Sequence, residues 1–238
     1  MPEPLLSVRG LVSGYGDVQV LWGIDLDVAE GEIVCLVGSN GAGKTTLLHT
    51  ISGLVRAQSG TVRLADSDLT RASPNAVLGA GIAHVPEGRR LFKGLNAKDN
   101  LLLGAYLRTD KAQIADDLDR VFELFPILKE RRSQDATTMS GGEQQMCAIA
   151  RGIMSRPRLL MIDELSLGLA PGLVERLGEA LIEINKQGLT ILLVEQDVMT
   201  AFELASRAFV IESGRIAKSG STRALSDDPA IRQAYLGL

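Results

Sequence analysis

The chain alternates short runs that are apolar at every position with longer segments in which apolar residues recur every three or four positions. Residues 33–37 and 159–162 are of the first kind, and each run ends at a glycine or an aspartate. Continuous apolar runs are typical of strands covered on both faces, as in parallel sheets. Residues 173–184 are of the second kind, with apolar side chains at steps of four and three, which place them on one face of a helix. The alternation predicts βαβ units and an α/β fold with a parallel sheet.

Two regions depart from this alternation. Residues 6–10 and 18–28 have strand character with only the turn Gly14-Tyr15-Gly16 between them, so we expect an antiparallel β-layer at the N-terminus. Residues 96–154 contain almost only helix-compatible patterns, including 99–107 and 112–124. The whole chain, 1–238, is therefore interpreted as one domain: residues 1–95 and 155–238 form the α/β core, and about 96–154 form an inserted helical subdomain.

Composition narrows the class of protein. Hydrophobic residues make up 45% of the 238 positions, enough for a large core, so a disordered chain is excluded. The net charge of −4 is opposite to the balance expected of a nucleic-acid-binding protein. Cys35 and Cys147 lie in apolar runs and are expected to be reduced, as in the cytosol. No apolar stretch approaches the roughly 20 residues of a membrane span, and the start, residues 1–4, resembles no secretory signal.

A phosphate-binding loop follows the first apolar run. The segment Gly38-Ser39-Asn40-Gly41-Ala42-Gly43-Lys44-Thr45 matches G-x-x-x-x-G-K-[ST] and is followed by a predicted helix that starts at Thr46 and continues to residue 54. Glycines let successive N–H groups turn toward an anion, and the helix N-terminus adds partial positive charge. Lys44 is predicted to reach the β- and γ-phosphates, and the Thr45 hydroxyl to hold Mg²⁺. The alternative interpretation, a glycine-rich turn with a solvated lysine, does not explain why the segment lies between a strand and a helix.

A second site element ends the run 159–162. Asp163 and Glu164 stand at the carboxyl end of this predicted strand, where ligands bind in open α/β sheets. Asp163 is expected to hold the hydrated Mg²⁺, and Glu164 to orient or deprotonate the attacking water. Alone, such a pair would equally suit a capped strand end; the phosphate loop favours the catalytic interpretation.

Between these two motifs, Ser140-Gly141-Gly142-Glu143-Gln144 opens a predicted helix at residues 145–155. In isolation it would be an ordinary loop–helix junction. In the order phosphate loop, helical segment, Ser-Gly-Gly, Asp-Glu, however, the chain resembles the ATP-binding subunit of an ABC transporter over nearly its entire length. The resemblance implies that Ser140, Gly141, Gly142 and Glu143 cover an ATP held by a second subunit. It also makes Tyr15 the platform for adenine, although a surface turn tyrosine would look the same.

Three departures from the wider family resemble one subfamily, the ATP-binding subunits of branched-chain amino-acid importers. Glu87, in Pro86-Glu87-Gly88, replaces a glutamine and is implied as a further Mg²⁺ ligand; Gln196 replaces a switch histidine and is implied to contact the γ-phosphate. Leu169 stands where the wider family has aspartate, and Leu165 where the subfamily more often has proline.

The resemblance also implies partners and a location. These are a second ATPase subunit, identical or not, and separate transmembrane permease subunits that contact residues around 88–110. A periplasmic or extracellular solute-binding protein would act indirectly, and no nucleic acid is involved. The chain would lie peripherally at the cytoplasmic face of the inner membrane. Alternatives are an importer subunit for another cargo such as urea or a lipid, a soluble ABC ATPase, and a nucleotide switch without hydrolysis.

Overall fold

Residues 4–236 of the computed structural model are described here. Residues 1–3, which carry most of the expectation about a secretory signal, lie outside this range. No helix within residues 4–236 is both long and apolar enough to cross a bilayer.

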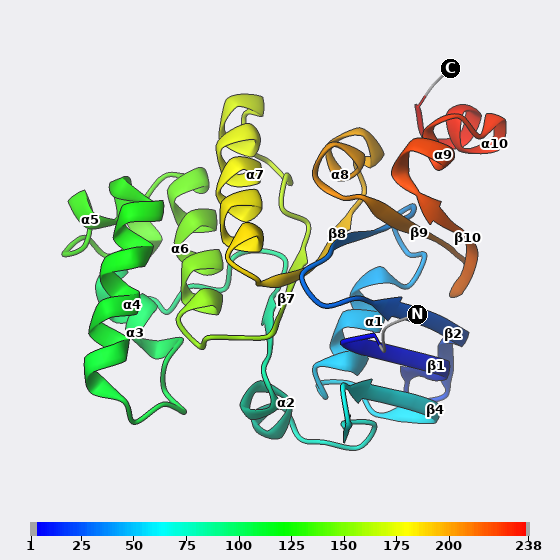
Figure 1. Ribbon diagram of the computed structural model, residues 1–238, viewed down its shortest axis with the longest axis horizontal. Coiled ribbons are helices and arrows are strands. Elements are labelled where there is room, and N and C mark those ends of the chain that lie inside the picture. The colour runs from blue at the N-terminus through cyan, green and yellow to red at the C-terminus, as the bar shows by residue number, and fades with distance from the viewer. Residues whose placement is uncertain (1–3, 237–238) are drawn as a thin grey trace.

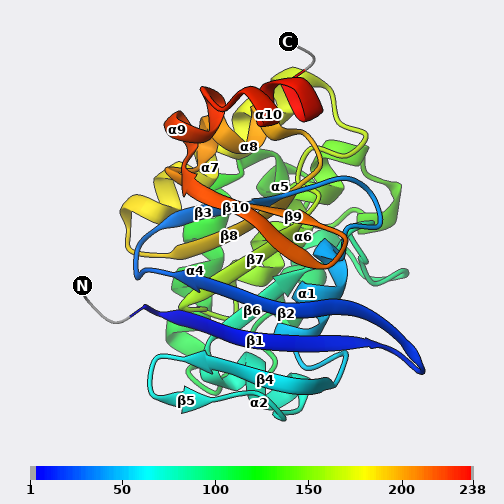
Figure 2. The ribbon, with the colours of Figure 1, turned by 90° about the vertical axis from the view of Figure 1, so that its right-hand side faces the viewer.

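Two β-sheets organise the chain (Figure 2). The larger sheet has the strand order β10-β9-β3-β8-β7-β6, parallel from β9 to β6, with β10 antiparallel at one edge. Its strands are β3 (Ile33–Val37), β6 (Ile82–Val85), β7 (Leu159–Asp163), β8 (Thr190–Glu195), β9 (Arg207–Glu212) and β10 (Arg215–Ser221). The smaller, antiparallel sheet has the order β2-β1-β4-β5. It contains β1 (Leu6–Tyr15), β2 (Val18–Val28), β4 (Ala57–Leu64) and β5 (Ser67–Asp68).

The helices fall into two groups (Figure 1). Between β6 and β7 the chain forms only helices: α3 (Ala97–Leu103), α4 (Lys111–Leu124), α5 (Pro126–Glu130), the 3₁₀ turn η1 (Ala136–Thr138) and α6 (Gly141–Ile153). The others join or follow strands: α1 (Lys44–Ile51), α2 (Pro74–Ala80), α7 (Pro171–Lys186), α8 (Val198–Leu204), α9 (Thr222–Ser226), α10 (Pro229–Ile231) and η2 (Arg232–Leu236).

The larger sheet is buried on both faces, which explains its uniformly apolar strands. Side chains that alternate along β3 belong to two different hydrophobic clusters: Cys35 packs with α6 to α8, and Leu36 packs with α1 and the smaller sheet. Every residue of β3, β7 and β8 is buried. The fold class expected from the sequence, an α/β core with an antiparallel β-layer and helices inserted between two core strands, is confirmed.

Several element ends differ from the sequence-based predictions. The first strand runs to Tyr15 instead of residue 10, because Tyr15 pairs with Val18 across a two-residue hairpin loop. The helix predicted for 46–54 begins at Lys44 and ends at Ile51, since Gly53 has a positive φ of 74° that ends the helix. The helix predicted for 99–107 is Ala97–Leu103, and residues 104–107 continue it as turns with i→i−3 hydrogen bonds; glycine at 104 lets this turn lie close to the Arg151 carbonyl oxygen.

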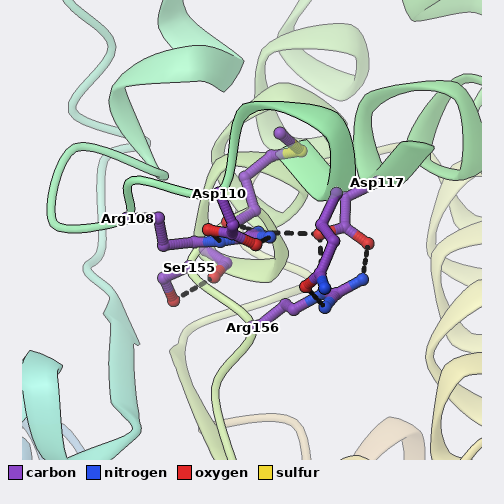
Figure 3. Close-up of polar contacts among 8 residues, drawn as sticks. Arg108, Asp110, Asp117, Ser155 and Arg156 are labelled. Atoms are coloured by element: carbon purple, nitrogen blue, oxygen red, sulfur yellow. Dashed lines mark hydrogen bonds and ion pairs between the residues drawn. The ribbon is translucent and has the colours of Figure 1, made fainter. Parts of the chain in front are cut away.

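A buried ionic network ties the inserted helices to the core (Figure 3). Asp117 on α4 is buried and forms ion pairs of 2.7 Å with both Arg108 and Arg156. Arg108 also donates to the Met154 carbonyl oxygen at 2.9 Å and pairs with Asp110. The network thus joins α4 to the turn between α6 and β7, where the inserted segment returns to the sheet.

We expect Asp117→Ala to lower the free energy of unfolding by about 3 kcal/mol, because it removes the buried carboxylate that pairs with both Arg108 and Arg156. Urea unfolding followed by circular dichroism measures the change. Asp116→Ala is the matched control, since Asp116 is exposed on the same helix; equal losses in the two variants would contradict the role of the network.

Candidate functional site

The phosphate loop connects β3 to α1 through backbone conformations that only small residues adopt. Gly41 and Gly43 have φ angles of 79° and 109°. A Cβ on Gly38 would lie 2.4 Å from the carbonyl oxygen of Ile211. The curled segment therefore requires glycine at these positions, and it places the N-terminus of α1 at the carboxyl end of the sheet.

Lys44 is the buried cation of this loop. Its ammonium donates to the carbonyl oxygens of Gly38, at 2.9 Å, and Ser39, at 3.4 Å. It also lies 3.4 Å from a carboxylate oxygen of Glu164. The side chain is thus folded back into the loop, and its charge faces the end of β7.

Asp163 ends β7 with a carboxylate that has no hydrogen-bond partner. Both oxygens are buried and unsatisfied among the described residues. Burial, together with the nearby carboxylates of Glu164 and Glu87, raises the pKa of Asp163 from 3.8 to about 6. The Thr45 hydroxyl and the Lys44 ammonium oppose this rise in pKa, although the Thr45 hydroxyl forms no hydrogen bond with the carboxylate in this geometry.

An open cleft of about 530 Å³ lies beside these groups; Gly38, Ser39, Ala42 and Asp163, which the sequence assigned to the site, do not line it. Residues from four separate parts of the chain meet at this cleft. Sequence reasoning had assigned them to one site. The lining residues are Asn40, Gly41, Gly43, Lys44, Thr45, Thr46, Glu87, Glu164 and Gln196, together with Val20 and Leu167, which that reasoning did not single out. The cleft is therefore formed by the ends of β3, β6, β7 and β8, as expected for an open parallel sheet.

The residues at this cleft also match what Mg²⁺ requires. No group of three His, Cys, Asp or Glu side chains in residues 4–236 converges closely enough to bind a metal unaided. Mg²⁺ is commonly held by one or two carboxylates, with water and phosphate oxygens as its other ligands. The unsatisfied Asp163, beside the Thr45 hydroxyl and near Glu87, fits that pattern.

Tyr15 lies at the end of β1, half-exposed, and is not among the cleft residues. Its hydroxyl is 3.3 Å from Nδ1 of His49 on α1. The edge of the His49 ring in turn meets His84 on β6, with ring centroids 5.7 Å apart. The sequence did not indicate this contact, because the three residues come from distant segments.

Ser140 to Glu143 also lie outside the cleft. Ser140 caps α6: its hydroxyl accepts from the Glu143 N–H at 3.4 Å, and the Glu143 carboxylate accepts from the Ser140 N–H at 2.8 Å. A Cβ on Gly142 would lie 2.5 Å from Leu173, so glycine allows α6 and α7 to approach closely. Within one chain, this segment and the phosphate loop do not form a single pocket.

Among the described residues, three of the six non-glycine residues with positive φ lie in or just after segments that line the cleft. Glu164 has a φ of 55°, and its N–H donates to the Val194 carbonyl oxygen at 2.9 Å. Gly88, Arg89 and Arg90, which follow Glu87, all have positive φ. The guanidinium of Arg151 on α6 holds this turn by donating to the carbonyl oxygens of Arg90 and Arg89, at 2.9 and 3.3 Å.

Sequence reasoning missed one buried carboxylate, Glu195, at the end of β8. It accepts two hydrogen bonds from Ser166, from the backbone N–H at 2.9 Å and from the hydroxyl at 3.0 Å. Burial raises the pKa of Glu195 to about 7. The signal was present in the sequence, because Glu195 is the one charged residue in the otherwise apolar or uncharged run 190–195.

The fold and the cleft define a phosphate-loop ATPase, and sequence comparison identifies its family. A family model described as ABC transporter matches residues 21–166, which is more than half of the chain. The chain belongs to the ABC transporter family, and it is an ATPase of that family.

Relatives match over the full length of the chain. The high-affinity branched-chain amino acid transport ATP-binding protein BraG of Pseudomonas aeruginosa is 46% identical over 98% of this chain and 100% of its own length. A probable branched-chain amino acid transport ATP-binding protein, LivF of Archaeoglobus fulgidus, is 34% identical over 98% and 99%. The lipopolysaccharide export system ATP-binding protein LptB of Acidithiobacillus ferridurans is 30% identical over 98% and 97%.

Solved structures agree with the fold. An ATP-binding subunit of an ABC transporter superposes with a TM-score of 0.84 at 29% identity, covering 98% of this chain and 96% of its own. A nucleotide-free ATP-binding cassette superposes with a TM-score of 0.83 at 23% identity, covering 96% and 97%. The second match supports the fold alone.

We expect Asp163→Asn to stabilise the nucleotide-free protein in a pH-dependent way. A pKa of about 6 in the folded state, against an ordinary 3.8, means that the folded protein binds this proton more tightly than the unfolded chain does. Stability therefore falls as pH rises from about 3.8 to about 6, by about 3 kcal/mol.

The Asp163→Asn variant does not lose stability in this way, because asparagine does not ionise. Its advantage over wild type in chemical denaturation should be smallest near pH 4 and largest above pH 7, without nucleotide or Mg²⁺. Asp116→Asn, at an exposed position, is the control. An advantage that does not change with pH would contradict the unpartnered burial of Asp163.

Proposed function

We propose that this chain is the ATP-hydrolysing subunit of an importer for branched-chain amino acids. The proposed cargo rests on the 46% identity to BraG, which extends over 98% of this chain and 100% of BraG. LptB, whose name gives lipopolysaccharide export, is 30% identical; the higher identity to BraG favours amino acids over a lipid cargo. Glu87 and Gln196, which stand where the wider family has glutamine and histidine, also favour the branched-chain amino-acid subfamily.

In this proposal the phosphate loop binds the triphosphate of ATP. Its N–H groups and the N-terminus of α1 face the phosphates. Lys44, which in this structure pairs with Glu164 and with loop carbonyls, exchanges these partners for β- and γ-phosphate oxygens. The exchange releases Glu164 toward the cleft.

Asp163, Thr45 and Glu87 would hold Mg²⁺, which supplies positive charge against the phosphates. Glu164 orients the attacking water and accepts its proton, and Gln196 donates a hydrogen bond to the γ-phosphate. Tyr15, held at its hydroxyl by His49, presents its ring to adenine.

The second half of the site is proposed to come from another ATPase subunit. Ser140, Gly141, Gly142 and Glu143 begin a capped helix N-terminus that does not line the cleft of its own chain. A helix N-terminus with free N–H groups suits a phosphate. A second subunit, identical or not, turned head to tail, would place this segment over the γ-phosphate.

The membrane partners are proposed to dock beside the inserted helices. Phe92, Leu103, Tyr106 and Leu107 are large apolar residues that remain exposed there. Neighbouring exposed apolar side chains commonly mark an interaction surface. Transmembrane permease subunits at this surface would hold the chain at the cytoplasmic face of the membrane, with a solute-binding protein on the other side of the complex.

Glu164→Gln should preserve ATP binding and abolish turnover, because glutamine keeps the shape of the side chain but accepts no proton. We expect at least about a hundredfold lower kcat, measured as phosphate release, and a nucleotide-loaded dimer on size-exclusion chromatography. Normal turnover would remove Glu164 from the mechanism.

Lys44→Ala should weaken ATP binding by at least about tenfold in calorimetry, because a charge-assisted contact to the phosphates is lost. Unchanged affinity would contradict the phosphate-loop assignment.

The cargo is tested on the membrane complex that copurifies with this chain, reconstituted with its solute-binding protein. Leucine, isoleucine and valine are expected to raise its ATPase rate, and urea is the comparison solute. Stimulation by urea alone would overturn the proposed cargo while leaving the ATPase assignment in place.

A further inference from the structure

We propose that Glu195 is a positioning residue for hydrolysis: by binding Ser166, it fixes the strained backbone of Glu164 without contacting the nucleotide. The inference rests on the role proposed above for Glu164. It concerns a residue that lies one position before Gln196 and is not itself part of the cleft lining.

The contact between Glu195 and Ser166 is specific at both ends. One carboxylate oxygen of Glu195 accepts the Ser166 backbone N–H at 2.9 Å, and the other accepts its hydroxyl at 3.0 Å. Glu195 is fully buried, whereas Ser166 is partly exposed at the start of the loop that follows Glu164. Both oxygens of a fully buried carboxylate are thus used on a single residue.

Two consecutive residues of β8 hold the strained segment. The Val194 carbonyl oxygen accepts the N–H of Glu164, and the Glu195 side chain binds Ser166 two residues later. Between these two points Glu164 keeps a φ of 55°, which is uncommon for a residue with a side chain. Strained conformations persist where the surroundings over-determine them, and here the two hydrogen-bonded ends do so.

The same contact joins two segments that line the cleft. Ser166 is followed by Leu167, and Glu195 is followed by Gln196; both following residues face the nucleotide cleft. Glu195 also pairs in register with Val37, the last residue before the phosphate loop. A displacement of Ser166 is therefore expected to move Glu164 relative to the phosphates while leaving the phosphate loop in place.

Fold stability alone is a poor explanation for this carboxylate. Burial raises its pKa, and the carboxylates of Glu164 and Asp197 add to this effect, while the two bonds from Ser166 oppose it. A buried charge held only by neutral donors among like charges stabilises the fold less than an apolar side chain of the same size would. A role in positioning the neighbouring Glu164 explains why a carboxylate is present at residue 195.

The test measures ATP turnover in the complete transporter complex and ATP affinity of the same preparations. Glu195→Ala removes the contact and should lower kcat by at least about tenfold, with KM for ATP within about twofold of wild type. Glu195→Gln should restore kcat to within about threefold, because its amide oxygen accepts the Ser166 N–H and its NH₂ donates to the hydroxyl. Ser166→Ala keeps only the backbone bond and should lower kcat by about two- to fivefold.

Two controls separate positioning from a general loss of stability. Glu32→Gln changes a part-buried carboxylate at the opposite end of the same sheet, where it accepts from the Ala29 N–H and pairs with Arg207; it should lower the melting temperature but not kcat. The double variant Ser166→Ala/Glu195→Ala should turn over no more slowly than Glu195→Ala, because both changes remove the same contact.

A kcat for Glu195→Ala within twofold of wild type overturns the proposal, and so does a Gln variant as slow as the Ala variant. If Glu195→Ala does not fold, Ser166→Ala decides: wild-type turnover overturns the proposal, and a loss in kcat alone supports it. The Glu164→Gln variant keeps the two hypotheses apart. If it retains turnover, the proposed role of Glu164 fails; if only Glu195→Ala retains turnover, the positioning role alone fails.

Discussion

A surplus of buried negative charge at the carboxyl ends of the parallel strands determines most of what surrounds the cleft. The carboxylates of Asp163, Glu164 and Glu195 lie there with a single buried ammonium, that of Lys44, among them. The carboxylates of Asp163 and Glu195 lower the stability of the nucleotide-free chain, because burial raises the pKa of both and charge is costly away from water. A ligand that brings a divalent cation compensates this charge, so binding stabilises the folded state beyond what its contacts alone would give.

The hydrophobic core therefore stabilises the fold, whereas the buried carboxylates of the site destabilise it. The apolar faces of β3, β7 and β8 pack into two hydrophobic clusters, and this burial offsets the cost of the strand ends. The backbone follows the same division: β3, β7 and β8 contain no residue with positive φ, whereas Glu164 and the residues of the turn 88–90 have positive φ. Both strained segments are held by hydrogen bonds from a neighbouring element, β8 in one case and Arg151 of α6 in the other. Strain at such positions is commonly associated with function.

A structural feature can be predicted from the sequence when the residues that cause it are close together in the chain. The parallel strands follow from continuous apolar runs, and the phosphate loop follows from glycines needed within eight residues. The helix ends were predicted less well, because they depend on single residues and on backbone hydrogen bonds that periodicity does not show: Gly53, with its positive φ, ends α1, and residues 104–107 continue α3 only as turns. Contacts between distant segments, such as Tyr15 with His49 and Glu195 with Ser166, have no periodicity to reveal them. Glu195 was nevertheless visible as a charge in a buried run, and such a residue requires a partner.

The inserted helices give the proposed closure of two subunits a route to the membrane partners. Helix α6 begins at the Ser140 cap, and further along it Arg151 holds the carbonyl oxygens of the turn after Glu87 and lies 5.3 Å from the ring centroid of Phe92. One rigid helix thus connects the segment proposed to cover a partner's ATP with the exposed apolar surface. A ligand shifts such an equilibrium only by its differential affinity for the closed state. In the proposed dimer the γ-phosphate would supply that difference, since ADP would leave the Ser140 segment without this group to bind, and its loss on hydrolysis would reopen the site.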